Sequence, residues 1–231
     1  MMVDIFSSFD DHNMVFLSFV SLLWAGTLWV MVLFSMDYWV IKSRWSILLD
    51  SPKQIIYSQV FRSFGKNLGG FVNLVVGLFS FLLLTNLLGL FPYVFSSTSH
   101  LAVTFSLAFP FWFSLILSGF MNNMYAFTAG LLPGGAPTAL NPFLVLVESL
   151  SICMRPITLS VRLAANMGAG HVVLGLIGTY LSSSFFCYSL LITLSLIFVQ
   201  VIYFMFEFGV SLIQGYVFSL LVTLYADEHT H

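Results

Sequence analysis

The chain has 231 residues, of which 59% are hydrophobic and only 7% are charged, and its mean hydropathy is +1.01. Soluble domains usually carry about a quarter charged residues, so this composition excludes a soluble globular protein and predicts an integral membrane protein. The formal net charge of −2 says little about partners, and no nucleic-acid partner is expected. Long uncharged runs are typical of membrane-spanning helices, whereas β-barrel strands are short and alternating. We therefore expect an all-α fold in a single membrane domain, residues 1–231.

The first expected membrane crossing is the uncharged run over residues 14–34, which is long enough for one spanning helix. The segment that follows, residues 35–66, holds most of the basic residues of the chain. Basic segments next to spanning helices stay on the inner side of a membrane. We therefore place this segment on the inner side, facing cytoplasm or matrix, and the acidic N-terminus outside.

The basic segment is predicted to contain an amphipathic helix over residues 51–66. Ser51 is a favourable N-cap, and Pro52 suits the first position of a helix. The apolar residues Ile56 and Val60 follow at helical spacing, beside basic side chains on another face. A helix with one apolar stripe and a basic face is expected to lie on the membrane surface.

Two more spanning helices are expected, followed by a break. Uncharged runs predict these helices over 71–91 and 101–121. Asn, Gly and Pro residues crowd the segment 122–142, which predicts turns and no helix there.

Two stretches of about 40 residues complete the membrane domain, over 138–181 and 185–226. Straight helices of that length would measure roughly 60 Å, about twice the hydrocarbon thickness of a bilayer. They must therefore be strongly tilted, bent or broken, and Pro156 is a ready kink site. We expect them to form an antiparallel hairpin, which gives about five membrane-embedded helices and places the C-terminus on the inner side.

The charged and amide residues of the hairpin recur at intervals of seven. No Asp, Glu, Lys or Arg occurs over 67–147 or 163–206, and an arginine at the bilayer centre costs roughly 2.5–3.5 kcal/mol. Charge in such a setting is by default a functional site. Residues seven apart share one helix face. The first stretch carries Glu148, Arg155 and Arg162 at this spacing, and Asn166, four residues beyond Arg162, joins the same face. The last stretch carries Glu207, Gln214 seven residues later and Glu228 fourteen beyond that.

An antiparallel hairpin would bring the two stripes level in three tiers, because level residues then have a nearly constant sum of residue numbers. With the turn near Tyr188, the tiers are Arg162 with Gln214, Glu148 with Glu228 and Asp227, and His171 with Glu207. Histidine and carboxylate side chains exchange protons, whereas an arginine cannot be deprotonated. Two proton-accessible sites separated by a fixed cation are two half-channels. Another component must then carry the proton from one half-channel to the other.

The expected topology assigns each half-channel to one side of the membrane. Glu148, Asp227 and Glu228 belong to the inner half-channel, and His171 with Glu207 to the outer one. The structural alternatives are a packed hydrogen bond between the outer pair and a plain solvated chain end for Asp227 and Glu228. Two ligands alone make a weak metal site, so no resident metal is predicted, and zinc bound to the outer pair would act as an inhibitor.

Three short segments carry specific motifs. They are LSVRLAANMGAGH at 159–171, TNLLGLFP at 85–92 and LIQGYVF at 212–218. In this combination, and over nearly the whole chain, the sequence resembles subunit a of the F-type ATP synthase in its mitochondrial form. The resemblance implies that Arg162, with Asn166 and Gln214, faces the carboxylates of the rotating c-ring, against which the two long helices lie steeply tilted.

The resemblance also implies a function, a location and partners. The chain would be a proton-translocating stator subunit of the membrane sector, without a cofactor or a catalytic site of its own, because ATP chemistry happens on other subunits. It would be a multi-pass protein of the mitochondrial inner membrane, with its N-terminus in the intermembrane space and its C-terminus toward the matrix. Its partners would be the c-ring, other stator and membrane subunits, and lipid.

Two residue assignments and the function itself have alternatives. Arg155 is not fixed by the family pattern, and it either forms a salt bridge with Glu148 or extends to the inner interface. In the first case Glu148 could be a partner of Arg155 and nothing more. Gln214 contacts Arg162 or the rotor, or else makes an interhelical hydrogen bond. The alternative functions are a secondary transporter that binds an anionic substrate at Arg162, and a passive structural subunit of a respiratory complex.

Overall fold

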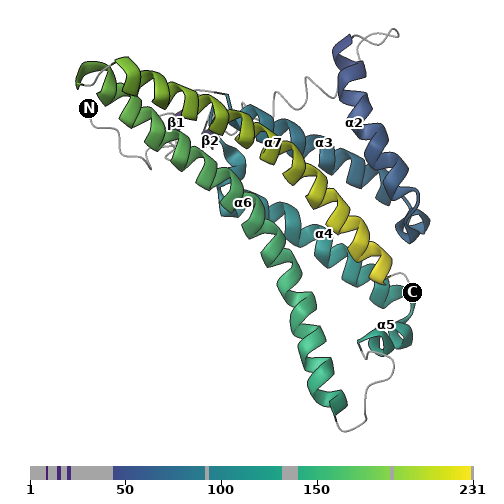
Figure 1. Cartoon of the computed structure of the whole chain (residues 1–231). Helices are drawn as coiled ribbons and strands as arrows, with labels where there is room; N and C mark the ends of the chain where they lie inside the picture. The colour runs from purple at the N-terminus through teal and green to yellow at the C-terminus, as the bar shows by residue number, and fades with distance from the viewer. Residues whose placement is uncertain are drawn as a thin grey trace.

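The described part of the chain is almost entirely helical, which confirms the expected all-α fold. The computed structural model describes residues 9, 15–16, 20–21, 44–91, 94–131, 140–187 and 190–229. The α-helices are α2 (Arg44–Val60), α3 (Phe71–Gly89), α4 (Leu101–Asn122), α5 (Met124–Gly130), α6 (Asn141–Cys187) and α7 (Leu190–His229), with 3-10 turns η2 (Phe64–Asn67) and η3 (Ser97–Ser99). Four of these helices, α3, α4, α6 and α7, are long and apolar enough to cross a membrane (Figure 1).

The expected first crossing, 14–34, falls mostly outside the described residues. Its described positions form two short antiparallel strands, β1 (Val15–Phe16) and β2 (Val20–Ser21), with Val15 opposite Ser21. At these four positions the backbone is therefore paired as strands and is not helical.

The surface helix α2 begins at Arg44 and not at Ser51, so Pro52 lies inside the helix. Proline removes one hydrogen bond within a helix, but a freed carbonyl at the surface can be solvated. The predicted apolar stripe is present, since Ile56 and Val60 are fully buried. It packs into the helix bundle, so this helix is held by protein contacts.

The connection from α2 to α3 depends on one glycine. Gly70 precedes α3 with a φ of +83°, in the left-handed region that glycine adopts without strain. The next break differs from the prediction, because α5 (Met124–Gly130) is a short helix within the segment expected to form turns. Here Tyr, Phe and Ala separate the turn residues and favour a helix of seven residues, about two turns.

The two long helices confirm the expected antiparallel hairpin, with the turn between Cys187 and Leu190. They contain 47 and 40 residues, or ~70 and ~60 Å at 1.5 Å per residue. Helix α6 continues through Pro156 without a break. Figure 1 shows that it bends, so that its C-terminal part follows α7 whereas its N-terminal end extends away from the other helices.

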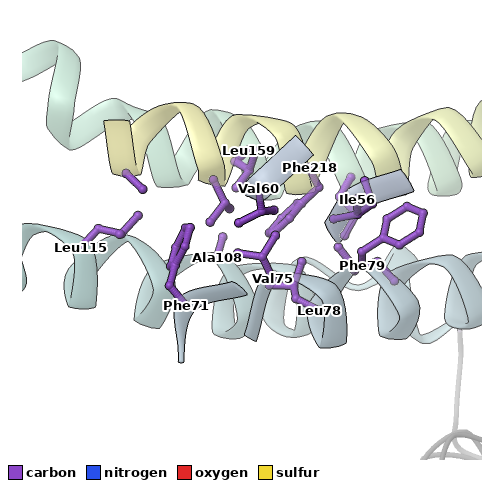
Figure 2. Close-up of a cluster of buried hydrophobic side chains, with 14 residues drawn as sticks. Ile56, Val60, Phe71, Val75, Leu78, Phe79, Ala108, Leu115, Leu159 and Phe218 are labelled. Atoms are coloured by element: carbon purple, nitrogen blue, oxygen red, sulfur yellow. The ribbon is translucent and has the colours of Figure 1, made fainter. Parts of the chain in front are cut away.

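The apolar core lies where α2, α3, α4, α6 and α7 meet (Figure 2). Its members are Ile56, Val60, Phe71, Val75, Leu78, Phe79, Leu82, Ala108, Leu115, Leu159, Leu163, Phe218, Val222 and Ala226. Between membrane helices, such interlocking contacts supply van der Waals packing, which lipid contacts match less closely. A hydrogen bond of 2.6 Å from Gln59 Nε2 to the Tyr216 hydroxyl also joins α2 to α7.

Candidate functional site

Arg162 lies on an exposed face of α6, in a segment of membrane-spanning character. Among the described residues, no acidic side chain lies within 4 Å of its guanidinium group. The neighbouring residues on this face are small, with Ala165 and Ala169 exposed. A Cβ added to Gly168 would meet no atom within 4 Å. The chain thus presents a cation on an open surface that a second helix could approach closely.

Arg155 differs from Arg162 although it lies on the same helix. Its Nη2 is 3.8 Å from Glu148 Oε1, and its side chain is only 18% exposed. The guanidinium carbon lies 5.0 Å from the ring centroid of Tyr225 on α7, a cation–π distance. The salt bridge to Glu148, one of the two predicted alternatives, is therefore confirmed.

Gln214 is buried on α7 and pairs with Asn166 on α6. Asn166 Nδ2 donates a hydrogen bond of 2.8 Å to Gln214 Oε1. The tier prediction had placed Gln214 opposite Arg162, one turn earlier, so the interhelical hydrogen bond is the alternative that the structure shows. Gln214 Nε2 is buried and has no hydrogen-bond partner within the described part of the chain.

The outer pair, His171 and Glu207, is brought to the same level of the hairpin. Glu207 is only 3% exposed. Its carboxylate lies against Gly170, and a Cβ added to Gly170 would overlap it. His171 Nε2 and Glu207 Oε1 are buried, and neither has a hydrogen-bond partner among the described residues. The side chain of Tyr203, one turn before Glu207, lies beside the carboxylate. Within the described part of the chain, His171 Nε2 and Glu207 Oε1 therefore make no hydrogen bond to each other.

Contacts along the hairpin show that Gln214 is level with Asn166 and not, as predicted, with Arg162. The Arg155–Tyr225 and Asn166–Gln214 contacts share one register. Between Gly170 and Glu207 the register is shifted by less than one turn. The tier prediction assumed one constant register along the whole hairpin, which these contacts do not follow.

Asn86 is a polar residue of the site that sequence reasoning assigned only to a motif. It is fully buried on α3, and its Nδ2 donates to the Ser211 carbonyl on α7 at 3.5 Å. Its Oδ1 has no partner among the described residues. An amide inside a spanning helix was the available signal, because such side chains bond across helices. We call Asn86, Asn166, His171, Glu207 and Gln214 the polar region.

The residues expected at the inner half-channel have separate partners. Glu148 pairs with Arg155 and its side chain is 41% exposed. Asp227 Oδ1 accepts a hydrogen bond of 3.4 Å from the backbone N–H of Gly65, in η2. The Glu228 side chain lies outside the described side chains. In the described part of the chain, no three His, Cys, Asp or Glu residues are grouped as metal ligands.

Comparison with known proteins places the chain in a family. The family described as "ATP synthase A chain" matches residues 14–227. The ATP synthase subunit a of Artemia franciscana is 43% identical, over 99% of this chain and all of the relative. Those of Locusta migratoria and Anopheles gambiae are 40% and 37% identical, each over 99% of both chains. These matches favour a subunit of that complex over the transporter and passive-subunit alternatives. The chain belongs to the ATP synthase A chain family.

Proposed function

We propose that the chain conducts protons as the stator subunit of the membrane sector of an F-type ATP synthase. Family membership over nearly the whole chain supports the complex, and four long apolar helices support a multi-pass membrane location. We assign it to the mitochondrial inner membrane, with the N-terminus in the intermembrane space and the C-terminus toward the matrix. Its partners are the c-ring and the other stator and membrane subunits.

One observation carries this proposal: Arg162 is exposed at membrane depth and lacks an acidic partner among the described residues. Exposure of an arginine to lipid costs about 2.5–3.5 kcal/mol. A carboxylate on another chain would remove that cost, and the small residues Ala165 and Ala169 let a partner helix come close. The c-ring carboxylate is the partner that fits this charge.

Arg162 then has two effects on protons at the interface with the ring. Its charge offsets the desolvation of a ring carboxylate that has lost its proton. The same charge repels free protons and cannot pass them on, because guanidinium does not titrate in proteins. Protons therefore reach the other side only on the moving ring.

The polar region supports the outer half-channel. Unpaired buried atoms on Asn86, Gln214, Glu207 and His171 are costly in a membrane unless they have further partners. Water and protons arriving from the intermembrane space would supply those partners. Glu207 and His171 then exchange protons on the way to the ring.

The inner half-channel leads from the ring toward Glu148, Asp227 and Glu228. Glu148 lies 14 residues before Arg162, ~21 Å along a helix, and its side chain is partly exposed. The Glu148 side chain remains 41% exposed beside Arg155, so water can reach it. Asp227 contributes one oxygen to η2 and lies beside Glu228 in sequence.

Two arginine substitutions in the assembled complex test the proposal. Arg162→Ala should abolish proton-driven ATP synthesis, because ring carboxylates can no longer enter the interface in the charged form. Arg155→Ala, two turns away, is the matched control and should retain most of the synthesis. Both rates are measured in membrane vesicles after equal amounts of complex have been verified.

A conservative substitution sharpens the result. Arg162→Lys keeps the charge but replaces a planar, weakly hydrated fork by a compact, strongly hydrated ammonium, so synthesis should also fail. Normal synthesis by a correctly assembled Arg162→Ala complex would overturn the proposed function.

A further inference from the structure

In the interior of helix α6, a proline leaves one backbone carbonyl without its usual donor. Pro156 lies inside α6 and has no N–H, so the carbonyl of Ile152, four residues earlier, loses its donor within the helix. The indole N–H of Trp112, on α4, donates a hydrogen bond of 3.0 Å to this carbonyl. A side chain 40 positions away in the sequence thus replaces the missing donor.

The position of Trp112 is itself fixed by its surroundings. Its ring is partly buried and lies 5.8 Å from that of Phe109, at an angle of 38°. Both helices have membrane-spanning character, so water is scarce at this contact. A carbonyl without a donor is costly there, which makes this hydrogen bond more valuable than it would be at a wet surface.

We infer that Trp112 is a positioning residue that holds α6 against α4 at Pro156. Proline gives α6 a weak point, and the indole fixes the carbonyl beside it, so that the segment before Pro156 keeps one direction. That segment carries Glu148 and Arg155, whereas Arg162 lies beyond the proline. Trp112 therefore sets the geometry between the inner carboxylate and the gating arginine.

The effect on proton movement rests on the proposed function, but the hydrogen bond does not. If the N-terminal part of α6 moves, Glu148 changes its distance from the ring, and proton release slows. The hydrogen bond can be tested separately, because it protects the backbone of α6 whether or not protons flow.

Three variants of the assembled complex make the test. Trp112→Phe removes the N–H and keeps a large aromatic ring. The double variant Trp112→Phe with Pro156→Ala returns a backbone donor to the carbonyl within the helix. Phe113→Leu, at an exposed aromatic residue next to Trp112, is the matched control. Amide hydrogen exchange over residues 149–157 and proton-driven ATP synthesis are measured for each.

We expect Trp112→Phe to accelerate exchange about tenfold, the size of effect that follows from an unsatisfied buried carbonyl, and to slow synthesis. The double variant should return both quantities to within about twofold of the parent, and Phe113→Leu should change neither. Exchange unchanged in Trp112→Phe, or accelerated equally in the single and double variants, would overturn the hydrogen-bond assignment. Exchange that responds while synthesis does not would overturn the positioning role and leave the proposed function intact.

Discussion

The apolar core and the polar region share three helices, α3, α6 and α7, yet buried polar atoms have different partners in the two regions. Near the core, buried hydroxyls bond to their own helix, as Ser160 Oγ does to the Ile157 carbonyl at 2.9 Å and Ser219 Oγ to the Tyr216 carbonyl at 2.8 Å. In the polar region, buried atoms on four of the five residues have no partner among the described residues.

The different partners of the buried polar atoms indicate that the two regions have different roles in the helix bundle. Where the hydroxyls are closed on the backbone, apolar side chains interlock and hold the helices together. Where amide and carboxylate atoms have no hydrogen-bond partner among the described residues, the proposed function assigns them water and protons as partners. Substitutions in the core should therefore reduce the amount of folded subunit, and substitutions in the polar region should reduce proton flux.

The largest expected effect is on stability, from Phe218→Ala in the apolar core. Phe218 is fully buried, and deleting a buried phenyl ring costs about 3–5 kcal/mol in water-soluble cores, part of it from the cavity that remains. We expect a lower thermal midpoint of the purified complex and less assembled subunit. Ile213→Ala, at a 62% exposed neighbour on the same helix, is the control. Equal losses for both variants would remove the distinction between core and surface packing.

The next effect is on proton flux, from Glu207→Gln in the polar region. The amide keeps the volume of the carboxylate but cannot carry the proton, so proton-driven synthesis should slow and its pH dependence should change. The thermal midpoint should stay close to that of the parent. Ser195→Ala, an exposed site on the same helix, should alter neither quantity. An unchanged flux with an unchanged pH dependence would remove Glu207 from the proton path.

A smaller effect is expected from Gly170→Ala, which adds a methyl group where the Glu207 carboxylate lies. The carboxylate must move, so synthesis should slow without the loss of any titratable group. Gly175→Ala is the matched control, because its Cβ would meet no atom within 4 Å. In a Glu207→Ala background Gly170→Ala should add nothing. A further loss in that background would show that the methyl group acts on something other than the carboxylate.

The smallest effect separates the two roles of Glu148. The ion pair with Arg155 is partly exposed, and such pairs contribute about 0.2–1 kcal/mol. If Glu148 also releases protons, Glu148→Gln should slow synthesis and ATP-driven pumping together, even in an Arg155→Gln background. No effect of Glu148→Gln in that background would leave it as a partner of Arg155 alone. With Glu228→Gln the loss should be non-additive if both side chains serve one water-filled path.

The sequence predicts the long elements well because their signal is strong and local. Uncharged runs locate α3 and α4 to within two residues, and the predicted centre of the hairpin lies between the end of α6 at Cys187 and the start of α7 at Leu190. The start of α2 and the presence of α5 were missed. Pro52 was taken as the first position of a helix, although a proline inside a surface helix is tolerated when water can satisfy the backbone. For α5, the Asn, Gly and Pro residues of 122–142 were taken to exclude any helix, although Met124–Gly130 is long enough for a short one.

Side-chain partners were predicted less well because they depend on helix shape. The His171–Glu207 level was found from numbering alone, whereas Gln214 bonds to Asn166 and not to Arg162. The register differs along the hairpin, and residue spacing carries no sign of that difference. The partner of Asp227 could not be predicted either, because the η2 backbone that contacts it is distant in sequence.

The exposed guanidinium of Arg162 has a consequence for the biogenesis of the complex. Under the proposed function, a newly inserted chain that has not met the c-ring holds this cation against acyl chains, at a cost of about 2.5–3.5 kcal/mol. Docking against the c-ring would remove that cost. Arg162 would thus stabilise the assembled subunit and destabilise a subunit that has not been assembled. Turnover of unassembled subunits by membrane proteases would then fall when this arginine is replaced by an apolar residue.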